Sequence, residues 1–391
     1  MTKDACIIGW AHSPFGKLDS PDLESLIAAT VPQALRNAEI EAEAIDGVYL
    51  GTYNSGFTHQ AFESGLVGMA VPELRFKPAQ RLENACATGS AALYAAVDFI
   101  ESGRGRFALV VGVEKMTLVP PAEAGDLMIR SSYFKEEGNF QPGFAGVFGH
   151  IAQSYFQRFG DHSLELATIS AKNHRHAALN PYAHFKKDFG VEFCNTVSDK
   201  NPLVAGPLRR MDCSPISDGS AVLVIADREA AMASKCAVGF KARGQVNDFM
   251  ALSRRDNPWT FEGAARAWRK ALAEAKVTLN DLNFVETHDC FTIAELLEYE
   301  AMGLADEGQG GRIVREGITQ REGKLPVNPS GGLKGRGHPL GATGVSMHVM
   351  AAMQLTGEAG AMQLPNAELA GVFNMGGVAV ANYCSILERV K

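Results

Sequence analysis

Short apolar runs alternate with amphipathic segments along the first part of the chain. Ala5 to Gly9 and Gly47 to Gly51 have the composition of buried strands, and Leu23 to Ala38 has the spacing of an amphipathic helix. Phe107 to Val113 reads FALVVGV, a continuous apolar run that is typical of a strand buried on both faces of a sheet. This alternation of strands and helices predicts an α/β fold.

The pattern changes between about residues 120 and 208. Prolines, aromatic residues, histidines and charges mix irregularly there, around short helical pieces such as Leu164 to His174. The aromatic content is too high for a disordered linker, so we expect an ordered excursion from the sheet. Regular structure resumes at Asp218 to Ala226, where a turn leads into another buried strand.

The second half of the chain repeats the order of the first. Gln33 to Val48 and Lys270 to Val285 each contain the end of a helix, a short acidic turn and the start of a strand. Ala87-Thr88-Gly89 has an echo in Ala342-Thr343-Gly344. We therefore expect a duplicated α/β unit with two similar helix N-termini facing each other, an arrangement that suits a site shared between the halves.

Charge and length exclude several classes of protein. The 391 residues carry a formal net charge of −7, so the chain lacks the basic surface that nucleic acids or anionic membranes attract. The N-terminus does not resemble a signal peptide, no apolar run is long enough to span a membrane, and the C-terminus is not a peroxisomal signal. We expect a soluble cytoplasmic protein that binds neither nucleic acid nor membranes.

The seven cysteines are widely scattered and show no CxxC or CxxH spacing. We therefore expect neither a disulfide framework nor a metal site, and a reducing compartment fits best. The cysteines are Cys6, Cys86, Cys194, Cys213, Cys236, Cys290 and Cys384.

A nucleophile is predicted at Cys86, in the segment from Glu83 to Gly103 that reads ENACATGSAALYAAVDFIESG. The thiol precedes a predicted helix, where unpaired backbone N–H groups and the positive end of the macrodipole favour the thiolate. Small neighbours leave room for a substrate to approach the backbone. A lone cysteine on such a helix is more often an ordinary buried residue, so the downstream motifs decide between the two interpretations.

Two histidines supply that evidence. His288 follows a predicted strand and precedes a predicted helix, and His338 lies in the glycine-rich stretch from Asn328 to Gly344. Either alone fits a surface or core histidine. Together with Cys86 they form the set of nucleophile, base and oxyanion partner that acyl transfer needs. The glycine-rich stretch could instead bind phosphate, but it has neither the P-loop order nor the GxGxxG spacing.

In this order, the motifs resemble those of the thiolase family, and within it the sterol-carrier-protein-type branch. NACATGSAA around Cys86 resembles the nucleophile motif, HDCF at His288 to Phe291 resembles the signature of the branch, and GHPLGATG at Gly337 to Gly344 is similar to the family's GHPxGATG. Met211 to Gly219 and Asn173 to Pro181 also resemble stretches of that branch.

The resemblance implies a five-layered αβαβα fold of two similar halves. Residues 1–235 would form the N-terminal half, with a loop domain inserted at about 120–208, and residues 236–391 the C-terminal half. It also implies a homodimer or homotetramer in lipid metabolism that uses acyl-CoA and CoA as substrates, with no bound cofactor and no metal.

Roles for the site residues follow from the same resemblance. Cys86 would be acylated by one thioester, and a second thioester would lose a proton at Cα and attack the acyl group, or the reverse. His338 would activate Cys86, and His288 would stabilise an oxyanion. Backbone N–H groups of Cys86 and Gly376 would form the other oxyanion hole.

This sequence departs from ordinary thiolases at one catalytic position. The acid/base cysteine of their C-terminal CxG motif is replaced by Asn374, so Cys290 in HDCF becomes the candidate acid/base. Lys334 and Arg336 are the cations of the glycine-rich stretch and are expected near the CoA entrance, although ordinary solvated loop charges explain them nearly as well.

Three other functions remain open. A decarboxylating ketosynthase needs no second thiol, so Cys290 beside His288 favours a thiolase. A thiolase-like aldolase that works with a small OB-fold partner protein needs no acylated cysteine, and an intact Cys86 argues against it. A non-catalytic scaffold subunit would not need the complete set of Cys86, His288, Cys290 and His338. The sequence leaves the acyl chain and the direction of the reaction undetermined.

Overall fold

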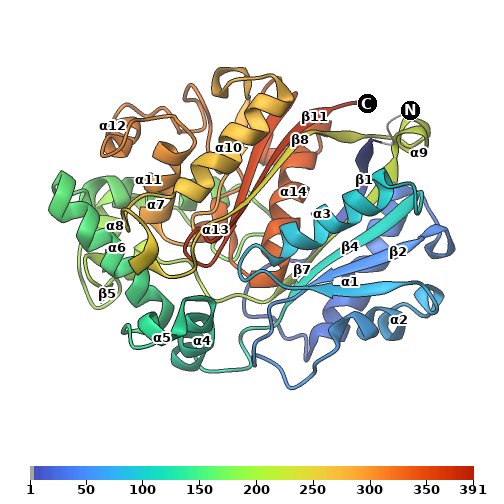
Figure 1. Ribbon diagram of the computed structural model, residues 1–391, viewed down its shortest axis with the longest axis horizontal. Coiled ribbons are helices and arrows are strands. Elements are labelled where there is room, and N and C mark those ends of the chain that lie inside the picture. Colours follow the sequence, from blue (N-terminus) through green and yellow to red (C-terminus); the bar gives the residue numbers. More distant parts are fainter. Residues whose placement is uncertain (1–3) are drawn as a thin grey trace.

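The computed structural model describes residues 4–391, which Figure 1 shows as strands flanked by helices. Nine strands form one mixed sheet in the order β3-β2-β4-β7-β1-β8-β11-β10-β9. Their bounds are β1 Ala5–His12, β2 Gly47–Gly51, β3 Ala79–Leu82, β4 Phe107–Glu114, β7 Gly219–Asp227, β8 Val238–Asn247, β9 Phe284–Glu286, β10 Leu369–Gly376 and β11 Ala381–Arg389.

The sheet contains the same arrangement of strands twice. In the first half β1 is antiparallel to β7, β7 is antiparallel to β4, and β4 is parallel to β2. In the second half β8, β11, β10 and β9 repeat this order and these directions. The halves meet where β1 pairs with β8. The duplication that the sequence predicts is therefore confirmed by the topology.

Helices lie outside and between the halves. Helix α1 (Leu23–Ala38) packs on β1 and β7, and α10 (Glu262–Ala275) packs on β8 and β11. Helices α3 (Thr88–Glu101) and α14 (Leu340–Thr356) contact each other, and α14 also contacts β4, β7 and β10 from both halves. The resulting layers are a helix, the first half of the sheet, the paired helices, the second half of the sheet and a helix. This is the order of the five-layered fold.

The two central helices approach each other closely at their N-terminal ends. A Cβ atom added to Gly89 would lie 2.7 Å from the nitrogen of Val345 and 2.9 Å from that of Gly344. A Cβ atom on Gly344 would in turn clash with the nitrogen of Ser90. These are the glycines of the two Ala-Thr-Gly echoes, so the repeat marks the crossing point of α3 and α14.

The strand β4 shows why the sheet needs continuous apolar runs. Leu109 and Val111 pack in the cluster that includes Ile27 of α1, whereas Val110 points into the cluster that includes Val345 of α14. Successive side chains of a strand face opposite sides. Both faces of β4 are therefore buried, as the sequence predicts.

The excursion leaves the sheet after β4 and returns at β7. It is mainly helical, and its helix α7 packs against segments that carry the functional site. Its elements are α4 Pro121–Met128, α5 Phe134–Glu137, α6 Gly143–Phe159, α7 Ser163–Ala177, α8 Gly190–Asn195 and the short strands β5 Leu203–Ala205 and β6 Leu208–Arg209. The remaining α-helices are α2 Leu66–Ala70, α9 Arg228–Ala233, α11 Thr292–Ala301, α12 Gly310–Arg315 and α13 Gly332–Arg336. Within residues 4–391, every helix is too short or too polar to cross a membrane.

Candidate active site

A tight turn presents Cys86 at the start of α3. The nitrogen of Ala87 donates to the oxygen of Asn84 at 3.0 Å, and Ala85 has a φ of 50°, in the left-handed region that residues other than glycine seldom adopt. The nitrogen of Asn84 donates to Oγ1 of Thr88 at 2.8 Å. This turn holds Cys86 in the interior, where only 4% of its surface is exposed.

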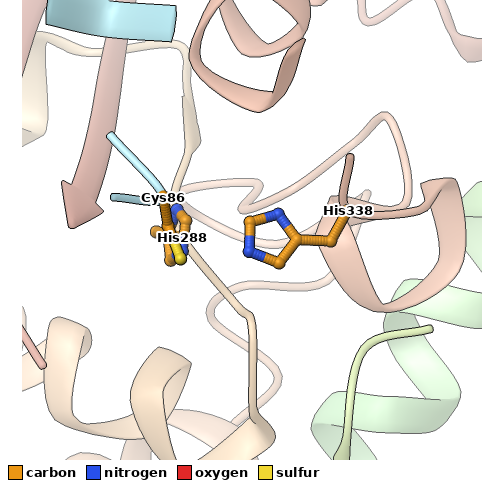
Figure 2. A group of neighbouring side chains, drawn as sticks. All are labelled: Cys86, His288 and His338. Atoms are coloured by element: carbon orange, nitrogen blue, oxygen red, sulfur yellow. The ribbon is translucent and has the colours of Figure 1, made fainter. Parts of the chain in front are cut away.

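Cys86, His288 and His338 come together from three distant segments. One sulfur or ring-nitrogen atom of each lies within 4.8 Å of the others. Figure 2 shows the ring of His338 pointing from the loop before α14 toward the other two side chains. The structure therefore brings together the nucleophile and both histidines that the sequence indicates.

The ring of His338 is held through Nδ1. This atom lies 2.7 Å from Oγ1 of Thr343, whose own hydrogen is donated to the oxygen of Pro339 at 2.9 Å. The hydroxyl must therefore accept from Nδ1–H, which leaves Nε2 with a free lone pair in the neutral ring. Burial, reinforced by the charge of Arg336, lowers the pKa of His338 to about 3. His338 is thus a neutral ring with its basic nitrogen unpartnered.

His288 is fully buried. Its Nδ1 lies 2.8 Å from Nδ2 of Asn374, and its Nε2 has no hydrogen-bond partner among the described residues. Burial, followed by the nearby His338 and Arg336, lowers the pKa of His288 well below its ordinary value. The ring is therefore neutral, and its unpartnered nitrogen is available to a substrate.

The thiol of Cys86 does not have the low pKa that the sequence predicts. Burial raises its pKa to about 12, and the carboxylates of Glu83 and Glu114 act in the same direction. The backbone N–H groups of Gly377 and of Cys86 itself oppose the shift. The free energy needed to remove a thiolate from water is larger here than the stabilisation that the start of a helix provides. Cys86 is therefore a neutral thiol in the free protein.

Cys290 shares a cavity with Cys86 and is 3% exposed. Burial raises its pKa well above the ordinary value, and a negative charge on Cys86 would raise it further. The oxygen of Cys290 accepts from the nitrogen of Ser214 at 2.9 Å, which fixes the HDCF turn against the segment after the excursion. The two thiols therefore face the same space, and ionisation of either opposes ionisation of the other.

Asn374 occupies the position of the C-terminal CxG cysteine that this sequence lacks. Its Nδ2 is 3.2 Å from the backbone oxygen of Cys86 as well as 2.8 Å from His288, and its Oδ1 accepts from Oγ of Ser90 at 2.8 Å. One amide thus connects β10 with α3 and the HDCF turn. Sequence reasoning missed this role because the three partners are remote in the chain.

Gly376 lies against the Cys86 turn, because a Cβ atom there would clash with the oxygen of Asn84. Only glycine permits this approach. The neighbouring N–H that opposes the rise in the pKa of Cys86 belongs to Gly377. An oxyanion contact from the N–H of Gly376 stays a prediction.

Lys334 and Arg336 are buried, with 3% and 0% of their surfaces exposed, so neither is a solvated loop charge. Their contact with CoA stays a prediction. Nη1 of Arg336 forms a buried ion pair with Glu286 at 3.1 Å. This pair draws the guanidinium inward, where its charge lowers the pKa of both active-site histidines.

Asp289 of HDCF fastens the two histidine-bearing segments together. Its carboxylate accepts from the nitrogen of Leu333 at 2.6 Å and from that of Lys334 at 3.1 Å. It also accepts from Nδ2 of Asn173 at 2.6 Å. A Cβ atom on Gly332 would clash with this carboxylate, so the glycine makes the contact possible.

A cavity of about 460 Å³ opens beside the two thiols and His338. Its wall is mostly apolar and comes largely from the excursion. A Cβ atom on Gly125 of α4 would meet nothing within 4 Å, so this glycine leaves space in the wall. The apolar side chains around it include Met116, Met128, Phe144, Ile216, Phe291 and Leu340.

Cys86, His288 and His338 are also the only described group of three or more side chains spaced to hold a metal ion. Thiolate and imidazole are good ligands for zinc. The same atoms must be free for acyl transfer, so a bound metal and this chemistry exclude each other.

Comparison with known proteins agrees with this architecture. Residues 5–229 match the family model described as "Thiolase, N-terminal domain", and residues 244–389 match "Thiolase C-terminal domain-like". The acetyl-CoA acetyltransferase of Methanothermobacter thermautotrophicus is 35% identical over 99% of this chain and 100% of its own length. Sterol carrier protein 2 of Homo sapiens is 32% identical over 92% of this chain and 67% of its own length.

The solved structure of an aldolase shares the fold. The "Ltp2-ChsH2(DUF35) aldolase" superposes with a TM-score of 0.84 at 18% identity, covering 99% of this chain and 98% of that one. At this level of identity the likeness concerns the fold alone, and the chemistry must be argued from the site.

Proposed function

The chain belongs to the thiolase family, and from this premise we propose that it is an acyltransferase that works through an acyl group on Cys86. It cleaves 3-oxoacyl-CoA with CoA, or condenses acyl-CoA with acetyl-CoA. The observation that carries the proposal is the convergence of a buried thiol and two histidine rings, each with an unpartnered Nε2 among the described residues, with a second thiol in the same cavity.

The first step forms the acyl-enzyme. His338 Nε2 takes the proton of Cys86 as the sulfur attacks the thioester carbonyl, and backbone N–H groups stabilise the oxyanion. The carbon–sulfur bond to CoA breaks, and the departing thiolate takes its proton from Cys290. His338 is then protonated and Cys290 is a thiolate, so the net charge is unchanged.

The second step makes the carbon–carbon bond. The thiolate of Cys290 removes a proton from Cα of acetyl-CoA, and its high pKa suits it to this weakly acidic position. His288 Nε2 stabilises the enolate oxygen. The carbanion attacks the acyl carbonyl, Cys86 leaves, and the proton held by His338 returns to its sulfur. Every group regains its starting state.

The cavity supports an acyl chain longer than acetyl. Its wall is mostly apolar, and its open space beside Gly125 would be superfluous for a two-carbon group. We therefore include longer 3-oxoacyl-CoA thioesters in the proposed substrate class, in lipid metabolism and in a reducing compartment such as the cytoplasm that keeps both thiols free.

We extend the proposal to a homodimer or homotetramer. Strand β3 is an unpaired edge of the sheet, and its residues Ala79, Gln80 and Arg81 are exposed. Phe62 and Phe76 nearby are 80% and 88% exposed. An open edge with exposed aromatic residues favours pairing with a second copy. Light scattering on the purified protein tests this directly.

The runner-up is an aldolase that needs a partner protein, and the fold it shares with the Ltp2-ChsH2(DUF35) aldolase is its support. That reaction would leave Cys86 unmodified. The experiment is therefore a thiolysis assay with 3-oxoacyl-CoA and CoA, joined to mass spectrometry of the intact protein. We expect shortened acyl-CoA and an acyl group on Cys86, both lost in Cys86→Ala. Cys236→Ala, outside the cavity, is the matched control. Absence of both products would contradict the proposal.

A further inference from the structure

Asn374 has a role of its own at this site. We propose that its amide fixes the tautomer of His288, so that the neutral ring carries its proton on Nε2, the nitrogen that faces the reacting groups. Asn374 is then a positioning residue for the oxyanion-stabilising histidine. The role of this N–H in catalysis rests on the proposed function, whereas the position of the proton on the His288 ring is a property of the free protein.

The orientation of the Asn374 amide follows from its neighbours. The atom 3.2 Å from it at Cys86 is a backbone carbonyl oxygen, which can only accept. A flipped amide would place Oδ1 against that oxygen, with two acceptors facing each other. Oγ of Ser90, by contrast, can donate to Oδ1 at 2.8 Å. The amide nitrogen is therefore the atom that faces Cys86 and His288.

The tautomer of His288 follows from that orientation. Nδ2 carries two hydrogens, and one is directed to the carbonyl of Cys86. The other is directed to Nδ1 of His288 at 2.8 Å, so Nδ1 must accept it. A neutral imidazole has one N–H, which then resides on Nε2. This N–H is buried without an acceptor, ready for a developing oxyanion.

The arrangement at His338 is the opposite. There a hydroxyl, whose hydrogen is already used, accepts from Nδ1 and leaves a lone pair on Nε2. The two rings therefore present one donor and one acceptor to the same space. Had the position of Asn374 held an acceptor, both rings would present lone pairs, and the site would have two bases and no imidazole donor.

A purely structural role for Asn374 makes a different prediction. An amide that only connects β10 to α3 would leave the proton of His288 distributed over both nitrogens. Replacing it would then change stability without changing the proportion of tautomers. The chemical shifts of the ring nitrogens separate these cases, because a nitrogen with a hydrogen and one with a lone pair differ widely.

The experiment uses full-length protein labelled with ¹⁵N in the imidazole rings, without substrate, and His288→Gln to assign the signal. We expect only the Nε2–H form in the parent. Asn374→Ala should give a mixture, and Asn374→Asp should move the proton to Nδ1, since a carboxylate accepts there. Ser90→Ala should keep the Nε2–H form, because the Cys86 carbonyl still orients the amide. An Nδ1–H form in the parent, or an unchanged signal in folded Asn374→Ala, would overturn the inference.

The parent spectrum decides the question even if the variants fail to fold. With thioesters added, Asn374→Ala should slow exchange of the α-protons of acetyl-CoA only about as far as the Nε2–H fraction falls, whereas Asn374→Asp, which moves the proton to Nδ1, should slow it by about 10²–10³-fold, the usual effect of losing one oxyanion donor. Acylation of Cys86 should be affected less, since it relies on backbone N–H groups. A parent that shows the Nε2–H form but no thioester chemistry would contradict the proposed function and leave the tautomer assignment standing.

Discussion

The rings of His288 and His338 are nearly perpendicular, at 82°, with centroids 5.0 Å apart. Two charged imidazoles at this separation inside a protein would repel each other, and burial keeps both neutral. The thiol and both rings are therefore uncharged in the free protein. In the proposed reaction, charge separates only when Cys86 attacks a substrate carbonyl.

The reactivity of Cys86 should rise steadily with pH. Because its thiol has a pKa of about 12 and His338 one of about 3, no thiolate–imidazolium pair forms between these values. The rate of alkylation by iodoacetamide should increase about tenfold per pH unit from pH 6 to 9. A plateau in that range would show a resting ion pair and contradict this prediction. Protection by acyl-CoA would confirm that the labelled thiol lies in the substrate cavity.

Cys290→Ala should separate the two partial reactions. Cys86 should still accept an acyl group, because the nucleophile, His338 and the oxyanion donors remain, and the departing CoA thiolate can take its proton from His338 in place of Cys290. Exchange of the α-protons of acetyl-CoA with deuterium should fall by about 10²–10⁴-fold, the usual contribution of a positioned base. A folded Cys290→Ala variant that exchanges at the parent rate would move the acid/base role to His338. Cys213→Ala, which removes the third thiol of the same cavity, is the matched control.

Gly125→Leu should shorten the accepted acyl chain. The added side chain enters open space in the cavity wall, so it should fold normally and occupy volume that a long chain needs. We expect kcat/KM for a long-chain 3-oxoacyl-CoA to fall at least about tenfold, in line with the cost of losing one or more buried methylenes. The value for acetoacetyl-CoA should stay within about twofold. Equal losses for both substrates would show that Gly125 does not border the acyl chain.

His174 should make the protein sensitive to acid. It is fully buried between the rings of Phe185 and Phe189, and neither of its ring nitrogens has a partner among residues 4–391. Burial lowers its pKa to about 2. The folded state keeps it neutral, whereas the unfolded chain takes up a proton below about pH 6.5. Stability is therefore lost as pH falls from 6.5 toward 2, by up to about 1.4 kcal/mol per pH unit from this residue. Denaturant titrations of His174→Phe at pH 6 and pH 4 should show a smaller loss than the parent.

Zinc should inhibit the proposed reaction and a chelator should leave it unchanged. The three atoms that could bind the ion are the ones that must move protons and acyl groups. We expect EDTA to preserve thiolysis and micromolar Zn²⁺ to abolish it reversibly, with parallel protection of Cys86 from alkylation. Activity that disappears with EDTA and returns with zinc would assign the trio a metal-dependent function.

Local signals predicted several helices and strands, and they pointed to three residues that the structure brings together. Helix α1 has the bounds that its amphipathic spacing predicts, and Cys86, His288 and His338 stand in short motifs at the starts of helices. Each of these features is encoded within a few neighbouring residues, so a single sequence is enough to find it.

Features that depend on remote partners were not predictable. Arg336 reads as a loop cation, but Glu286, 50 residues earlier, draws it into the interior. The high pKa of Cys86 comes from the burial that the whole fold imposes. The hydrogen bonds of the Asn374 amide join it to Cys86 and His288, which are 288 and 86 residues away in the sequence. No local pattern could therefore predict them.

The crossing of α3 and α14 has a consequence for how the enzyme tolerates a break in its chain. The helices that follow Cys86 and His338 meet backbone to backbone at Gly89 and Gly344, whereas the covalent link between the halves runs from β7 through the short α9 to β8. The relative position of Cys86 and His338 therefore depends on the contact surface between α3 and α14. Two separately made fragments, cut near α9, would have to recreate only that surface to restore a working pair.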